Sequence, residues 1–272
     1  MVSKSPDTSA TVMKALALLE TVAHSSRPLL LSEIASEVGF DRSTTYRLLN
    51  TLVNAGYVVR DRASKRYHLS YRLVTLSRHL LVDNERARAS REIMERIARK
   101  TGETIHLSAL DGLDEVLIQK VKGMQFLIVD FEIGERFRLH CTSVGKVILA
   151  YQDDSLLEQL IAAGLPQVAS NTITDPDRLR QELRQIREAG YAIDDHELAD
   201  HMRCISVPVF EADGRVTMGF SISGPDTRLT LEKLEEYKVP LLEGARELSE
   251  RLGGAPHLSA TSLLHSGSNI RP

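Results

Sequence analysis

The sequence predicts a protein of the α+β class with two domains, and three observations lead to that prediction. Residues 31–56 have the pattern of two short helices joined by a tight turn. Two short strand-like segments, 57–60 and 66–69, follow around a polar turn. From residue 103 onward strand-like and helix-like segments alternate, with hairpin signals that favour antiparallel pairing. We therefore expect a winged helix–turn–helix, a helical linker and an antiparallel sheet flanked by helices.

The first domain should contain three helices. Residues 10–24 carry an apolar stripe and are followed by the helix breaker Pro28. The second helix ends at Gly39, with Ser32 as its N-cap and one apolar face formed by Leu31, Ile34, Ala35 and Val38. The third helix runs from Arg42 to about residue 55 after the N-cap Asp41. Its inward stripe consists of Thr45, Leu48, Leu49 and Leu52.

The second domain is expected to begin with a helix that ends at Gly102. Strand-like segments follow at 104–110, 115–121, 126–130, 191–194, 203–210 and 216–223. Helix-like segments lie at 143–151, 155–163, 176–189 and 231–252. The dipeptides Asp111-Gly112 and Asp213-Gly214 are the hairpin signals between neighbouring strands.

The length and composition are those of a soluble globular protein. The chain has 272 residues, of which 42% are hydrophobic and 26% charged, enough for two domains with hydrophobic cores. No apolar run is long enough to span a bilayer, and the first ten residues lack the apolar stretch of a signal peptide. The two cysteines, Cys141 and Cys204, do not suggest a disulfide framework. We therefore expect a cytoplasmic protein that does not associate with membranes.

The charge is distributed unevenly along the chain. The net charge of −3 divides into +5 for residues 1–90, with 13 basic and 8 acidic residues, and −8 for the remainder. Between Arg42 and Arg78 there are eight basic residues and one acidic residue, Asp61. A basic region confined to the helix–turn–helix and the segment after it is typical of proteins that contact nucleic-acid phosphates.

The outward stripe of the third helix is polar and contains no acidic residue. It offers hydroxyl, amide, phenol and guanidinium groups, which can read base edges and hold phosphates in a major groove. A solvated helix face is the alternative interpretation. Basic residues on the wing would lie near the DNA backbone or a minor groove. The predicted DNA-binding residues are Arg42, Ser43, Thr44, Tyr46, Arg47, Asn50, Arg62, Lys65 and Arg66.

The chain lacks the common sequence patterns of enzymes, so we expect no catalytic residue and no cofactor. Gly145-Lys146 lacks the upstream glycine of a phosphate-binding loop. The segment 219–223 (GFSIS) matches a nucleophile elbow only in part, because it lies in an alternation of strand type. Ser221 and Ser223 instead share one strand face and offer two hydroxyl groups to a ligand. An enzyme with an accessory DNA-binding domain is the competing class.

A polar cluster between residues 194 and 204 raises the question of a metal site. The candidate ligands are His196, His201 and Cys204, since imidazole and thiolate groups bind zinc and other divalent ions. Their spacing matches no established motif, so we expect no metal and keep a metal-responsive sensor as an alternative. A catalytic Cys204 with a histidine base is a further alternative, and a buried cysteine in a strand is the ordinary interpretation.

Taken together, these segments resemble the IclR family of transcriptional regulators over residues 10–253. The similarity lies in KALALLE at 14–20, the helix–turn–helix at 31–58, TGETIHLSALDG at 101–112, CTSVGKVILA at 141–150, REAGYAIDDHE at 187–197, RCISVPVF at 203–210 and SISGP at 221–225. The resemblance implies a bacterial regulator with a winged helix–turn–helix at 10–72, a linker helix at 73–84 and a GAF-like effector-binding domain at 85–253. The segment 254–272 is expected to be a disordered tail.

The resemblance also implies an effector pocket. Within the family the chain is most similar to the branch that responds to 2-keto-3-deoxygluconate and related sugar acids. Amides at a helix start near Ser143 suit a carboxylate, whereas Asp194 would repel it and accept hydrogen bonds from ligand hydroxyls. A hydroxylated acid is therefore expected, with aromatic and 2-oxo acids as alternatives. The residues carried over are Phe126, Val129, Phe137, Ser143, Val144, Asp194, Met202, Cys204, Ser221 and Ser223.

Two further expectations follow from the resemblance. Asp200 and His201 stand where the family usually has Glu-Gly, which leaves a changed ligand or a bound metal open. Leu76, Leu80 and Leu81 are candidates for a dimer contact, and packing within their own domain is the alternative. We expect a repressor that binds double-stranded operator DNA as a homodimer or homotetramer.

Overall fold

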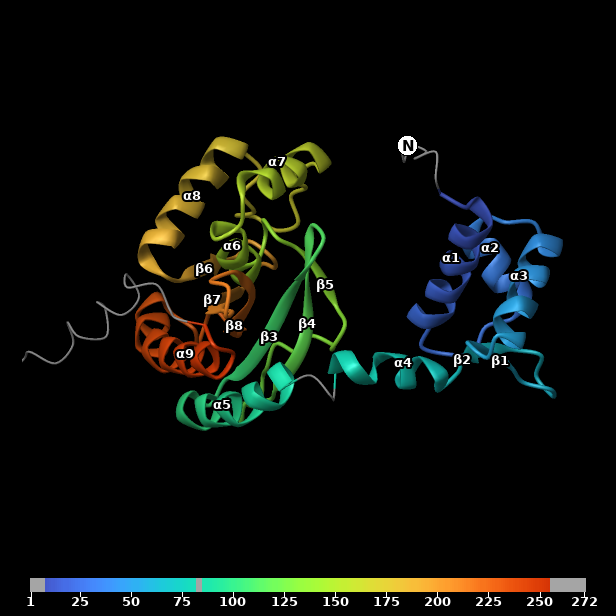
Figure 1. Cartoon of the computed structure of the whole chain (residues 1–272), viewed down its shortest axis with the longest axis horizontal. Coiled ribbons are helices and arrows are strands. Elements are labelled where there is room, and N and C mark those ends of the chain that lie inside the picture. Colours follow the sequence, from blue (N-terminus) through green and yellow to red (C-terminus); the bar gives the residue numbers. More distant parts are fainter. Residues whose placement is uncertain (1–7, 82–84, 255–272) are drawn as a thin grey trace, which may run out of the picture. The chain divides into compact units, whose positions relative to one another are not determined.

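The computed structural model describes residues 8–81 and 85–254, and the chain divides into two compact units, Met1–Leu80 and Leu81–Pro272 (Figure 1). The division falls inside the segment 73–84 that we expected to be a linker helix. The expected disordered tail, apart from Gly254, lies outside the described residues. In the described part of the chain, no helix has both the length and the apolar character needed to cross a membrane.

The first unit is a winged helix–turn–helix, as the sequence predicts. Helices α1 (Ala10–His24), α2 (Leu31–Val38) and α3 (Arg42–Asn54) precede an antiparallel hairpin of β1 (Val58–Arg60) and β2 (Tyr67–Leu69), and α4 (Arg72–Leu81) follows. The inward stripe of α3 is buried at Thr45, Leu48 and Leu49. The apolar core collects side chains from all the elements before α4: Leu18, Val22, Leu29, Ile34, Leu48, Leu49, Val58 and Tyr67.

The starts of α2 and α3 are stabilised in different ways. Asp41 caps α3 as predicted, because its Oδ1 accepts a hydrogen bond from the Thr44 N–H at 2.9 Å. The prediction of Ser32 as the N-cap of α2 is wrong, because that helix already begins at Leu31. Glu33 supplies the acceptor instead: its Oε2 accepts a hydrogen bond from the Leu30 N–H at 2.6 Å. A carboxylate reaching back from the first turn satisfies a backbone N–H that the helix leaves free.

The second unit is built on a six-stranded antiparallel sheet with the strand order β5-β4-β3-β8-β7-β6. The strands are β3 (Thr104–Asp111), β4 (Asp114–Val121), β5 (Arg136–Arg138), β6 (Ala192–Asp195), β7 (Met202–Phe210) and β8 (Val216–Pro225). The register places His106 opposite Ser221, and Ser221 opposite Ser206. Polar side chains are therefore aligned across three neighbouring strands.

Helices cover both faces of this sheet (Figure 1). On one face α5 (Glu85–Thr101) and α9 (Leu231–Arg251) enclose a core that includes Ile93, Phe220 and Leu241. On the other face α6 (Ser143–Ala150) packs against β7 and β8, α8 (Pro176–Ala189) packs against α6, and α7 (Asp154–Ala163) adds Leu160 to the same core. Gly145 permits a close approach, because a β-carbon there would collide with the Leu139 backbone. The first turn of α6 is thereby held against the chain that precedes it.

The predicted strand at 126–130 is wrong, and the edge strand β5 at Arg136–Arg138 was not predicted. Residues 122–135 are irregular instead. Lys120 holds this segment, with its Nζ 2.7 Å from Asp130 Oδ1 and 2.6 Å from the Phe131 carbonyl oxygen. These contacts replace a strand ladder and bring Phe131 toward the sheet. The remaining predicted strands of this unit, and the four helices from 143 onward, agree with the structure to within two residues at each end.

Candidate functional site

The outward face of α3 is accessible. Arg42, Ser43, Tyr46 and Arg47 are exposed, and Thr44 and Asn50 are partly buried. The opposite stripe of α3 is buried in the core of the first unit. Four of the predicted DNA-reading residues on α3 are therefore exposed to solvent, on the side away from the core.

The wing presents two of its three predicted basic residues to solvent. Arg62 and Lys65 are exposed in the turn between β1 and β2. Asp61 organises that turn, since its Oδ1 accepts hydrogen bonds from the Ser64 N–H at 2.6 Å and from the Ser64 hydroxyl at 2.7 Å. These bonds lower the pKa of the Asp61 carboxyl. The turn is thus fixed by local hydrogen bonds, which leaves both basic side chains available.

Arg66 differs from the expectation that it contacts DNA. Its Nη1 donates to the Pro28 carbonyl oxygen at 2.9 Å and lies 3.1 Å from Glu33 Oε2. Glu33 also pairs with Arg27 at 2.9 Å, and that hydrogen bond is the main reason why the pKa of Glu33 falls to about 2. The Arg66 charge is therefore engaged in holding the wing to α2.

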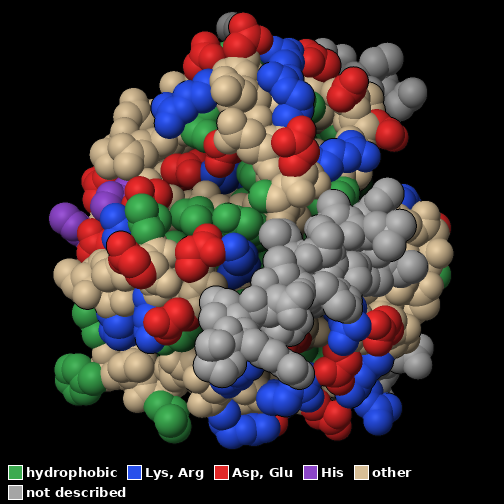
Figure 2. Space-filling view, turned by 90° about the vertical axis from the view of Figure 1, so that its left-hand side faces the viewer, with side chains coloured by type: hydrophobic (Ala, Val, Ile, Leu, Met, Phe, Trp, Pro, Cys, Tyr) green, Lys and Arg blue, Asp and Glu red, His purple; other side chains and the backbone are tan. Residues whose placement is uncertain are grey.

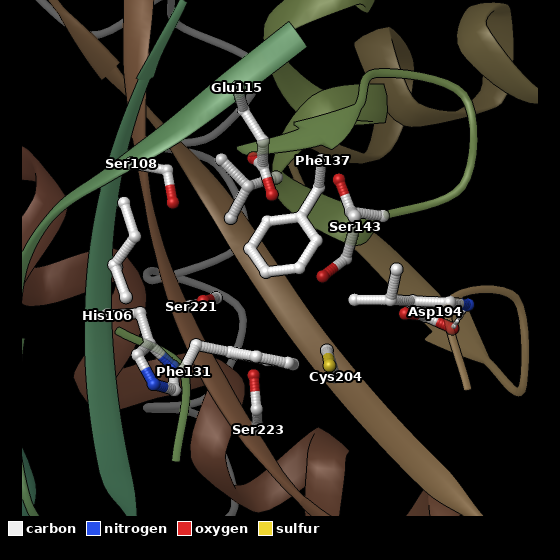
Figure 3. Close-up of a pocket in the computed structure, with 14 residues that line it drawn as sticks. His106, Ser108, Glu115, Phe131, Phe137, Ser143, Asp194, Cys204, Ser221 and Ser223 are labelled. Carbon is white, nitrogen blue, oxygen red and sulfur yellow. Dashed lines mark hydrogen bonds between the residues drawn. The ribbon is translucent and has the colours of Figure 1, made fainter. Parts of the chain in front are cut away.

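The second unit contains a pocket between the sheet and the start of α6 (Figure 3). The space between its lining atoms is about 330 Å³, a figure that includes the part open to solvent. Strands β3, β4, β7 and β8 supply one side, and the first turn of α6 supplies another. The lining residues are His106, Ser108, Glu115, Leu117, Phe131, Phe137, Thr142, Ser143, Val144, Asp194, Leu198, Cys204, Ser221 and Ser223.

Seven of the ten residues assigned to the effector site line this pocket, namely Phe137, Ser143, Val144, Asp194, Cys204, Ser221 and Ser223. The other three do not. Phe126 is fully exposed and Val129 lies in the irregular segment, because the strand expected there does not form. Met202 is buried at the start of β7, two residues before Cys204, and is not among the lining residues. Phe131 provides the aromatic wall, with its ring 4.8 Å from that of Phe137 and 5.7 Å from that of His106.

Sequence reasoning missed four polar lining residues, His106, Ser108, Glu115 and Thr142. His106 and Ser108 alternate with the apolar Ile105 and Leu107 on β3, so a period-2 pattern was present. The same pattern in β8 led us to Ser221 and Ser223. Applied to both strands, it would have placed His106 in the same site, because the register pairs His106 with Ser221.

The start of α6 is arranged to receive an acceptor. Thr142 caps the helix, with its Oγ1 accepting from the Gly145 N–H at 2.8 Å. The Ser143 hydroxyl shares a hydrogen bond of 2.6 Å with the Ser206 hydroxyl across the sheet. The first amides of a helix have no intrahelical acceptor, and they carry the positive end of its dipole. A ligand carboxylate beside Ser143 and Val144 would accept hydrogen bonds from these free amides and would be attracted by the positive end of the helix dipole.

Asp194 lies on the same side of the pocket as Ser143 in Figure 3, and a buried ion pair supports its position. Its Oδ1 accepts hydrogen bonds from the backbone N–H groups of Glu197 at 2.7 Å and Leu198 at 3.4 Å. The Glu197 carboxylate in turn receives Lys146 Nζ at 2.5 Å, and Lys146 is fully buried. Lys146 also donates to the Ile193 carbonyl oxygen at 2.9 Å. Asp194 therefore has one oxygen fixed by the protein and one, Oδ2, without a hydrogen-bond partner.

Burial changes the acid–base properties of the pocket. It raises the pKa of Glu115 to about 8 and that of Asp194 to about 7. It lowers the pKa of His106 to about 4, so that ring is neutral near pH 7. Both ring nitrogens of His106 and one carboxyl oxygen of Glu115 have no hydrogen-bond partner within the described structure. Such unpaired buried groups are the ones that a polar ligand can satisfy.

The low-priority metal candidates do not come together. Within residues 8–81 and 85–254, no three His, Cys, Asp or Glu side chains are grouped so that they could hold a metal ion. Cys204 lines the pocket, whereas His196 and His201 both lie next to Asp226, at 3.1 and 3.5 Å from its Oδ2.

Figure 2 shows one face of the molecule on which acidic and basic side chains are interspersed.

Comparison with known proteins identifies the family. The family model of the IclR helix-turn-helix domain matches residues 11–62, and that of the bacterial transcriptional regulator IclR C-terminal domain matches residues 79–250. The HTH-type transcriptional regulator KdgR of Escherichia coli K12 is 36% identical over 251 residues, which cover 92% of this chain and 95% of the relative.

Solved structures agree with this assignment. The crystal structure of Thermotoga maritima IclR matches with a TM-score of 0.72 at 34% identity and covers 89% of this chain and 98% of its own. The C-terminal domain of the E. coli regulator KdgR matches with a TM-score of 0.57 at 37% identity, over 62% of this chain and 99% of that domain. The chain therefore belongs to the IclR family of bacterial transcriptional regulators, which bind DNA and are not enzymes.

Proposed function

We propose that this regulator represses transcription from a palindromic operator and is controlled by a small hydroxylated carboxylate. Members of the family bind DNA through the helix–turn–helix and small-molecule effectors through the C-terminal domain. In this chain α3 and the wing residues Arg62 and Lys65 contact the operator, and the pocket between the sheet and α6 binds the effector. The effector must bind the DNA-competent and DNA-incompetent states with different affinities, since otherwise operator binding does not change.

The observation that carries this proposal is the set of polar groups that line the pocket. Helix amides at Ser143 and Val144 suit a carboxylate, and the serine hydroxyls of β8 suit ligand hydroxyls on the other side. The unpaired Asp194 Oδ2 accepts from a hydroxyl donor. A sugar acid such as 2-keto-3-deoxygluconate combines these groups in one small molecule. The 36% identity to KdgR and the resemblance to the sugar-acid branch support the same class.

An aromatic acid is the second candidate, because Phe131 and Phe137 form an aromatic wall. Their rings would contact the face or edge of a bound aromatic ring and leave its carboxylate at the α6 amides. An aromatic acid would leave the acceptor at Asp194 Oδ2 unused, unless its ring carries a hydroxyl group.

The test is calorimetry on the full-length protein with 2-keto-3-deoxygluconate, D-gluconate, pyruvate and 4-hydroxybenzoate as probes. We expect one of the sugar acids to bind and to shift operator affinity in a gel-shift titration. The double variant Ser221→Ala and Ser223→Ala should lose the response to the probe and keep its operator affinity, because both serines are far from α3 in sequence and belong to the other unit.

Ser155→Ala is the matched control, since Ser155 is an exposed serine at the start of α7. It should bind the probe as the wild type does. If the double serine variant responds to the probe as strongly as the Ser155 variant, the pocket is not the effector site. If only 4-hydroxybenzoate binds, the aromatic candidate replaces the sugar acid.

A further inference from the structure

The proposed effector pocket contains two acidic side chains and, among its described lining residues, no lysine or arginine. Glu115 comes from β4 and is 4% exposed, and Asp194 comes from β6 and is completely buried. In Figure 3 the Glu115 carboxyl points into the pocket from the side opposite Ser223. Its Oε2 has no hydrogen-bond partner, and the same holds for Asp194 Oδ2.

The charged groups around the pocket do not compensate Glu115. Lys146 reaches toward the site from α6, but its Nζ is engaged by Glu197, Glu182 and the Ile193 carbonyl oxygen. Burial is the main cause of the raised pKa of Glu115; a hydrogen bond with the Thr142 side chain lowers that pKa, and the charge of Asp194 raises it further.

On the β3 side of the pocket the titratable groups are also occupied or neutral. Burial is the main reason why the pKa of His106 is lowered, and the charges of Lys120 and Asp130 act on that pKa in opposite directions. Those two side chains pair with one another at 2.7 Å. Cys204 faces the pocket from β7, and burial raises the pKa of its thiol, so it carries no charge near pH 7.

An anion entering this pocket would therefore meet acidic groups without a compensating cation. A buried carboxylate is costly when it is unpaired, and a second negative charge beside it adds repulsion. The neutral form of Glu115 avoids both costs, and it turns an acceptor into an O–H donor. A carboxylic acid in that form can donate to an acceptor oxygen of the ligand.

We propose that Glu115 enters the ligand complex as a neutral carboxylic acid and donates a hydrogen bond from its unpaired oxygen to the anionic ligand. When Glu115 is ionised in the free protein, binding of the ligand anion is therefore accompanied by the uptake of one proton at Glu115. This inference rests on the proposed function, because it assumes that the pocket accepts a carboxylate. It makes Glu115 a specificity-determining residue that selects an acceptor oxygen at this position.

The proposal sets the sign and size of a pH dependence. With a pKa of about 8 in the free protein, Glu115 is mostly neutral at pH 7 and mostly ionised at pH 9. If only the neutral form binds the anion, affinity falls roughly tenfold between pH 7 and pH 9. Sugar acids remain anionic over this interval, so the change reports on the protein.

The experiment is calorimetric titration of the full-length protein with 2-keto-3-deoxygluconate at pH 7 and pH 9, in two buffers of different ionisation enthalpy. We expect the wild type to lose about tenfold in affinity and to take up close to one proton per ligand at pH 9. Glu115→Gln keeps the shape of the side chain and a donor group, so it should bind at both pH values with less than a twofold difference. The control Glu188→Gln removes an exposed carboxylate of α8 and should behave as the wild type.

Two results would overturn the proposal. One is wild-type affinity that rises with pH, and the other is a Glu115→Gln variant that loses affinity at pH 7 while it remains folded by circular dichroism. Either would mean that an ionised Glu115 accepts hydrogen bonds from ligand hydroxyls. The wild-type proton count needs no variant, so the proposal stays testable if the substitution prevents folding.

If neither this probe nor the other acids bind, the proposed function fails. The protonation state of Glu115 can then still be tested through the stability of the ligand-free protein. A raised native pKa stabilises the fold below the unfolded value of about 4.5, and that stabilisation is lost as pH rises toward 8. The stability of Glu115→Gln should therefore increase relative to the wild type between pH 5 and pH 8. A difference that stays constant over this interval would show an ordinary carboxylate and overturn the inference.

Discussion

Replacing Lys146 by methionine should destabilise the second unit by about 3–5 kcal/mol, the usual cost of removing one partner of a buried ion pair. Lys146 is fully buried, and its Nζ has three acceptors: Glu197 at 2.5 Å, the Ile193 carbonyl oxygen at 2.9 Å and Glu182 at 3.3 Å. Methionine fills much of the same volume and donates nothing. The loss therefore comes from the acceptors that remain.

The three acceptors contribute unequally to this cost. Glu182 has a third of its side chain exposed and can turn to water, whereas the Glu197 side chain is 9% exposed and cannot. An uncompensated Glu197 carboxylate would take up a proton, so the destabilisation should be smaller at pH 5 than at pH 8. Since the Glu197 N–H holds Asp194, the substitution should also weaken binding of the effector probe.

Urea unfolding followed by circular dichroism at pH 5 and pH 8 measures this effect. The double variant Lys146→Met with Glu197→Gln should recover part of the loss, because the amide removes the orphaned charge. Lys233→Met on α9 is the control: the Lys233 side chain is 41% exposed and pairs with Glu236 three residues along the helix, so its removal should change stability little. A Lys146→Met variant that loses less than about 1 kcal/mol at pH 8 would refute the reasoning, because surface pairs are worth that much.

The other predictions concern DNA binding and assembly. Arg47→Ala and Tyr46→Ala should each weaken operator binding by roughly 1–3 kcal/mol in gel-shift titrations, since both side chains are exposed on α3. Lys65→Ala should weaken binding to every sequence and reduce its salt dependence, because a wing lysine contacts phosphates; unchanged affinity in all three variants would exclude α3 and the wing as the interface. Leu76→Asp should lower the oligomeric state seen by light scattering, since Leu76 is 53% exposed on α4; a wild-type monomer at micromolar concentration would refute a dimer. The side chains of Leu80 and Leu81, the other candidates for that contact, lie outside the described residues.

The elements that could be predicted from the sequence are those with strong periodicity. In α3 a single inward stripe specifies both the helix and its buried face, and Asp41 marks its start. The segment 122–135 has no such pattern. Its shape depends on the ion pair between Lys120 on β4 and Asp130, which are ten residues apart in the sequence. Apolar residues there, such as Phe126, therefore gave a false strand.

The candidate site could be predicted only where the pattern was local. Ser221 and Ser223 stand out because they alternate with Phe220 and Ile222, which are buried on the other face of the sheet. Glu115 has no comparable signal. Its neighbour Asp114 is also acidic, and both follow a turn that could belong to the surface.

The structure separates those two acids by the strand alternation alone. Asp114 pairs with Arg136 at 3.3 Å and stays partly exposed, whereas Glu115 turns to the opposite face and is buried in the pocket. Helices cover both faces of this sheet, so alternation by itself does not tell which face of β4 receives the charged group. The same holds for Lys146, whose main partner Glu197 is 51 residues away in the sequence. Buried charges of this kind are specified by tertiary contacts. For that reason the sequence indicated the hydroxyl groups of Ser221 and Ser223 but not Glu115, the acid that we propose to carry the proton.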